Sequence, residues 1–138
     1  MAVEPKFQEL VGLLSASTKA AAQRKAEDDR LDAEGIVSAA RAFEPIQNFL
    51  NALADALKNG VDSSISLTMD GDWIPSNGRD YYMVFYKLWM PSRGLHELTF
   101  HVTGDYRRVE FEKHDFEISD LAAIENALKQ WAVLKLKG

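Results

Sequence analysis

Residues 98–111 read LTFHVTGDYRRVEF, and this stretch decides the fold. Apolar and polar residues alternate as far as Thr103, Gly104-Asp105 interrupts the pattern, and the alternation resumes after Tyr106. Alternation on both sides of a short glycine-containing interruption is typical of two antiparallel strands joined by a tight turn. The stretch therefore predicts a β-hairpin.

A two-residue turn at Gly104-Asp105 would set the register of this hairpin. Phe100 would then face Val109 on one side of the ribbon, and His101 would face Arg108 on the other. The turn and the hydrophobic pattern agree, because the apolar pairs share one side.

The preceding segment, YYMVFYKLWM at 81–90, alternates in the same way and ends at a PSRG turn. Gly94 suits the left-handed residue of a three-residue loop, Ser92 to Gly94, which would place Leu88 opposite Leu98. A one-residue slip would bury Lys87, which is unfavourable. With a further strand near Ile65, the predicted inner face comprises Ile65, Leu67, Val84, Tyr86, Leu88, Leu98, Phe100, Val109 and Phe111.

The first 60 residues predict helices. An apolar stripe recurs at helical spacing from Phe7, and the Ala-rich charged segment 15–35 is either a solvated helix or a mobile arm. Gly35 is expected to break the helix, and Pro45 to kink or restart it. Two later stripes follow the same period: Phe43, Ile46, Leu50, Leu53 and Leu57, and, in a closing helix, Leu121, Ile124, Leu128 and Trp131.

These elements predict one α+β domain over residues 1–138. Helices occupy 1–60, and 61–138 form a four-stranded antiparallel meander with a C-terminal helix packed on one face of the sheet. The segment GDWIPSNGRD at 71–80 is expected to be a loop. We expect a single domain because neither half would bury its apolar face alone.

Composition limits the function classes. The chain has 138 residues, of which 46% are hydrophobic and 27% charged, and its formal net charge is −5. An acidic chain disfavours nucleic-acid binding, which depends on neutralising phosphates. The absence of cysteine fits a reducing compartment, so we expect a cytoplasmic protein, and neither a signal peptide nor an apolar membrane-spanning stretch is evident.

No catalytic, cofactor or metal constellation emerges from the sequence. Successive side chains of a strand point to opposite faces, so His96 and His101 are expected on different sides of the sheet. His114 is expected roughly 20 Å from His101, given the length that each residue adds to a strand. The string at 70–80 departs from a calcium loop at its required glycine. Arg107 and Arg108 lie among acids, which favours ion pairs over phosphate contacts.

The outer side of the ribbon is the best candidate for function. Phe85, Trp89, His101 and Arg108 are expected there, with Trp73 in the nearby loop, and aromatics among charges are typical of a protein-binding surface. The N-terminal arm could instead cover them, or the strand could be buried on both sides. We therefore expect a non-enzymatic, adaptor-like protein-binding module, whose partner is another protein or a second copy of the chain in a homodimer. The alternative is an enzyme or small-molecule binder whose pocket is lined by Tyr82, Tyr86, Tyr106 and Trp131.

The order of helix, meander and helix, with LTFHVTGDYRRVEFEKHDFEI near its end, resembles the small bacterial immunity proteins of toxin–immunity systems. The resemblance covers about the last 80 residues and is architectural. It implies a bacterial, non-enzymatic protein that blocks a partner by binding its surface, and it assigns no functional residue.

Overall fold

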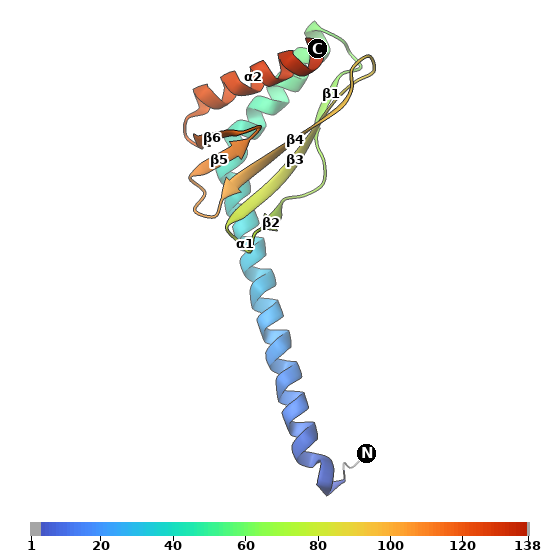
Figure 1. Ribbon diagram of the computed structural model, residues 1–138, viewed down its shortest axis with the longest axis vertical. Helices are drawn as coiled ribbons and strands as arrows, with labels where there is room; N and C mark the ends of the chain where they lie inside the picture. Colours follow the sequence, from blue (N-terminus) through green and yellow to red (C-terminus); the bar gives the residue numbers. More distant parts are fainter. Residues whose placement is uncertain (1–3, 138) are drawn as a thin grey trace. The chain divides into compact units, whose positions relative to one another are not determined.

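The computed structural model describes residues 4–137 and shows an α+β chain (Figure 1). A long helix comes first, an antiparallel sheet follows, and a second helix ends the chain. The elements are the 3-10 turn η1 (Pro5–Phe7), helix α1 (Gln8–Gly60), strands β1 (Ser66–Met69), β2 (Ile74–Ser76), β3 (Tyr81–Met90), β4 (Gly94–Thr103), β5 (Arg108–Phe111) and β6 (His114–Glu117), and helix α2 (Leu121–Lys137).

By its internal contacts the chain divides into two compact units, one ending at Glu34 and the other beginning at Gly35. In the first unit, α1 is exposed on all sides as far as Arg30, so the Ala-rich segment has the form of a solvated helix. The apolar stripe from Phe7 to Leu14 is exposed as well. The second unit holds every buried core residue of the described chain.

The predicted break at Gly35 is wrong, because α1 continues through this residue. Gly35 is buried, and a Cβ atom built on it would lie 1.9 Å from the Tyr82 hydroxyl oxygen. The glycine is therefore explained by the close approach of β3 to the helix. Close backbone approach is a use of glycine that sequence alone does not separate from helix termination.

Pro45 also lies inside α1, so the helix does not restart there as expected. Its side chain is exposed, while Phe43 and Ile46 on either side are at most 1% exposed. Packing of this stripe on the sheet holds the helix together across the backbone bond that proline removes.

The sheet has six strands in place of the four expected, all antiparallel, in the order β1-β3-β4-β5-β6, with β2 also paired to β3. Strand β2 forms within the segment expected to be a loop, where Ile74 pairs with Met83. Strand β6 pairs with β5 through a tight turn at Glu112-Lys113, whose φ angles are 47° and 66°. Neither residue is a glycine, so the usual sequence signal of such a turn is missing.

Both predicted hairpin registers are displaced by two residues. Leu88 pairs with His96, not Leu98, since the three-residue loop is Pro91 to Arg93 and so begins one residue earlier than expected. His101 pairs with Glu110, not Arg108.

The second shift has a local cause in the loop between β4 and β5. The Thr103 hydroxyl donates to the Asp105 carboxylate at 2.6 Å and accepts from the Arg108 backbone N–H at 3.1 Å. Asp105 also accepts from the Arg107 N–H, and these bonds lower the pKa of Asp105 below its usual value. Tyr106 adopts φ 63°. The side-chain bonds thus stabilise a longer loop than the two residues expected.

A shift of two residues keeps every side chain on its expected face, because the side-chain period of a strand is two. The predicted inner face is confirmed: all nine of its side chains are at most 5% exposed. They form one hydrophobic cluster with residues of α1 and α2, so both helices pack on this face. The expectation of a C-terminal helix packed on one face of the sheet is confirmed in this way.

Candidate binding surface

The side of the sheet opposite the two helices carries the other set of strand side chains. We call it the outer face. It comprises Tyr81, Met83, Phe85, Lys87 and Trp89 of β3, Leu95, Glu97, Thr99, His101 and Thr103 of β4, and Arg108 and Glu110 of β5.

An apolar pair dominates one end of the outer face. Trp89 is 43% exposed and its register partner Leu95 is 50% exposed. Phe85, two positions before Lys87 on the same strand, is half-buried opposite Thr99. Phe85 and Trp89 therefore lie on the expected side, and the alternative of a strand buried on both sides does not hold at Trp89.

Leu95 is a residue that the sequence reasoning missed. The expected register placed Glu97 opposite Trp89 and left Leu95 beyond the paired region. The observed loop has the expected three residues but begins one residue earlier, so Trp89 pairs with Leu95, and Lys87 pairs with Glu97. A test of alternative loop positions at PSRG, with Gly94 as the first residue of the strand, would have found the pair.

His101 lies near the end of β4 and is half-buried. Its neighbours across the strands are Met83 on β3 and Glu110 on β5, and its ring meets the edge of Tyr81 with centroids 6.0 Å apart. The predicted pairing of His101 with Arg108 is replaced by pairing with a carboxylate.

Arg108 lies at the start of β5, where its Nε donates to the Asp115 carboxylate of β6 at 2.8 Å. This hydrogen bond, and then the charge of Asp115, raises the pKa of Arg108 above its ordinary value. The sequence suggests Asp105, Glu110 or Glu112 as the ion-pair partner of this arginine, but the observed partner is Asp115, on a strand that the sequence did not reveal.

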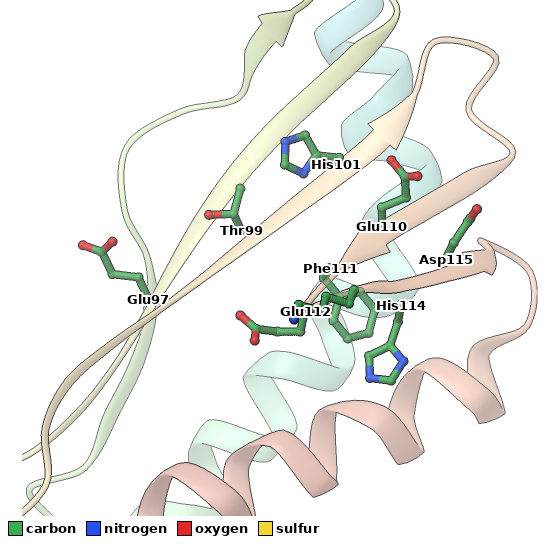
Figure 2. Close-up of a pocket in the computed structure, with 9 residues that line it drawn as sticks. Glu97, Thr99, His101, Glu110, Phe111, Glu112, His114 and Asp115 are labelled. Carbon is green, nitrogen blue, oxygen red and sulfur yellow. The ribbon is translucent and has the colours of Figure 1, made fainter.

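A hollow of about 550 Å³ opens where the ends of β4, β5 and β6 meet (Figure 2). Figure 2 shows His101 and His114 pointing to different sides, with the carboxylates spread between them. Within residues 4–137, no group of three potential ligands is placed to hold a metal ion. The lining consists of Glu97, Thr99, His101, Glu110, Phe111, Glu112, Lys113, His114 and Asp115, so acids outnumber bases and the hollow is negatively charged.

Trp73 is set apart from the other predicted site residues. Its ring meets the edge of Phe43 of α1, with centroids 5.2 Å apart, and it packs against the hydrophobic core. Since Phe43 belongs to the helical side of the sheet, Trp73 does not extend the outer face.

The aromatic rings proposed to line an internal pocket are packed against other side chains. Tyr82, Tyr86 and Trp131 are at most 6% exposed and belong to the core cluster. Tyr106 lies beside Tyr82 with ring centroids 6.0 Å apart. This packing offers no support for a small-molecule site among these residues.

Comparison with known proteins adds no further constraint. No protein-family model, curated protein or solved structure matches this chain significantly. Among the helices of residues 4–137, none has the length and apolar character needed to cross a membrane. Function is therefore argued from the geometry of the outer face.

Proposed function

We propose that this protein is a non-enzymatic binding module that holds another protein against its outer face. The observation that carries the proposal is the exposed cross-strand pair of Trp89 and Leu95, with the charged pair of Lys87 and Glu97 two positions farther along the strands. An exposed tryptophan beside an aliphatic neighbour, with charged residues close by, is the usual arrangement of an interface hot spot.

The charges on and beside the outer face indicate the kind of partner. Glu97 and Glu110 lie on the outer face, and Glu112 and Asp115 border it at the hollow. Lys87 is paired with Asp70 at 3.1 Å, which neutralises part of the positive charge nearby. A partner surface with an apolar centre and basic edges would complement this face, and a phosphate backbone would be repelled.

The resemblance to bacterial immunity proteins suggests how such binding acts. In this proposal the outer face binds over a partner's functional site and blocks it, so no catalytic group is required. The absence of cysteine fits a reducing compartment, and we propose the cytoplasm as the place of action.

Affinity co-purification from the source cells tests the proposal. Trp89→Ala and Leu95→Ala should each weaken capture of the specific partner about tenfold or more, because interface tryptophans and their neighbours commonly contribute about 2 kcal/mol. Val37→Ala is a control, since Val37 is also exposed, at 56%, but lies on α1 and not on the sheet. Circular dichroism would verify folding, and full recovery of every partner by folded variants would refute the role of this face.

A second copy of the chain is the competing occupant of the outer face. Light scattering over a range of protein concentrations separates the two cases. A monomer throughout supports a different protein as partner, and a dimer abolished by Trp89→Ala would replace that partner with a second copy.

A further inference from the structure

The helical side of the second unit has an apolar surface of its own, which the proposed function does not use. In α2 the stripe from Ile124 to Trp131 faces the core. Val133 and Leu134 point away from it and are 58% and 68% exposed, and Val61, just beyond α1, is 62% exposed.

These residues border a groove between the end of α1 and α2. One hollow of about 480 Å³ lies between the two helices, and an adjoining hollow of about 440 Å³ continues over the outer side of α2. We call the two together the helical groove. Its lining is Leu53, Leu57 and Val61 on one side, and Lys129, Gln130, Ala132, Val133, Leu134, Leu136 and Lys137 on the other.

The shape of the helical groove matches the surface of a third helix. Leu53, Leu57 and Val61 are four residues apart, as are Lys129, Val133 and Lys137, so each wall is a ridge of side chains one turn apart. Eight residues of helix extend about 12 Å. Ridges of this kind accept the side chains of another helix in the groove between them.

The charge of the helical groove is opposite to that of the whole chain. Lys129 and Lys137 bracket Val133 on α2, and Lys58 and Lys135 are next to lining residues in the sequence. Among the residues that the structure describes, none of these four lysines forms an ion pair, and the groove lining contains no carboxylate. Two lysines of the lining, Lys129 and Lys137, therefore flank an apolar strip in a protein whose net charge is −5.

We propose that the helical groove binds an amphipathic helix of another protein, whose apolar stripe is flanked by aspartate and glutamate. Leucine-like side chains of that helix would cover Val133, Leu57 and Val61, and its carboxylates would meet Lys129 and Lys137. Burial of the apolar strip supplies affinity, and the lysine pairs set the orientation and speed association.

The same observations disfavour two other occupants. A second copy docked symmetrically would bring its own lysines against Lys129 and Lys137, which costs free energy. A lipid surface would contact Val133 and Leu134 but would leave Leu53 and Leu57, which are half-buried in one wall of the groove, uncovered.

The experiment measures binding of two synthetic peptides to the full chain by fluorescence anisotropy. Both peptides carry leucine at helical i, i+3, i+4 and i+7 spacing; one has glutamate beside the stripe, and the other has lysine in every glutamate position. The glutamate peptide should bind at least about tenfold more tightly, and its affinity should fall as salt increases.

Two pairs of variants locate the site. The double variant Val133→Ser/Leu134→Ser should reduce affinity for the glutamate peptide about tenfold, and Val37→Ser, at an exposed valine of α1, should not. Lys129→Glu/Lys137→Glu should abolish the preference for glutamate, while Lys113→Glu, outside the groove, should leave it.

Several outcomes would overturn the inference. Equal binding of both peptides, or unchanged binding by the groove variants, would remove it. Groove-dependent sedimentation with phosphatidylglycerol vesicles, without peptide binding, would assign the surface to a membrane. Groove-dependent dimerisation would assign it to a second copy. None of these readouts depends on Trp89 or Leu95, so failure here is distinguishable from failure of the outer-face proposal.

Discussion

Two glycines of α1 illustrate how differently the same residue type acts at single positions. A Cβ atom on Gly35 would collide with the Tyr82 ring, whereas a Cβ atom on Gly12 would meet nothing within 4 Å. Tyr82 is only 2% exposed, so its ring has no free space into which to move. Gly35 is thus required by packing, and Gly12 only lowers the stability of the helix.

We expect opposite effects from the same substitution at these two positions. Gly35→Ala should destabilise the protein by about 1–3 kcal/mol, the usual cost of overpacking a core. Gly12→Ala should preserve stability or raise helix content, since glycine costs about 0.5–1 kcal/mol relative to alanine inside a helix. Thermal unfolding followed by circular dichroism measures both, and equal effects would show that Gly35 does not contact Tyr82 closely.

At the scale of elements, the chain's alternation identified the strands but not the turns between them. The inner face could be predicted residue by residue, because apolar side chains recur with a period of two. The registers could not, because loop length depends on hydrogen bonds such as those of Thr103 and on backbone angles at Gly94 and Tyr106. Strand β6 was missed because Glu112-Lys113 lacks the sequence signal of a tight turn.

The turn between β5 and β6 therefore offers a stabilising change. Glu112→Asn/Lys113→Gly should raise the free energy of unfolding by up to about 1–2 kcal/mol, since both positions have positive φ and Asn-Gly is the preferred pair for such turns. Chemical denaturation measures the change. Pro91→Gly, in the other hairpin loop, serves as a control in which no gain is expected, and a loss of stability in the Asn-Gly variant would contradict the observed backbone angles.

At the scale of the whole molecule, the core residues of the described chain run from Ala39 to Ala132. The segment before Gly35 contributes a long exposed helix and none of the buried hydrophobic side chains. The two proposed binding surfaces, the outer face and the helical groove, both belong to the second unit. Whether the chain behaves as a single domain, as the sequence predicts, is therefore open to a direct experiment.

A shortened chain of residues 35–138 should fold, with a free energy of unfolding within about 1 kcal/mol of that of the full chain. For a domain of this size, a change of about 1 kcal/mol corresponds to a shift of roughly 4–8 °C in Tm, so the two Tm values should differ by no more than this. The physical reason is that residues 4–34 contribute no core side chain. Calorimetry of both chains provides the measurement. A shortened chain that fails to unfold cooperatively would show that the first 34 residues are needed for the fold.

The sequence by itself determined the fold class and the two faces of the sheet. Both follow from the periodicity of apolar residues. A shift of two residues in strand register leaves each side chain on the same face of the sheet. Only the tertiary structure decided the registers, the two additional strands, the continuity of α1 through Gly35 and Pro45, and the exposure of Leu95, Val133 and Leu134. These features depend on loop hydrogen bonds and on contacts between segments distant in the chain, such as Gly35 with Tyr82, which no local pattern encodes.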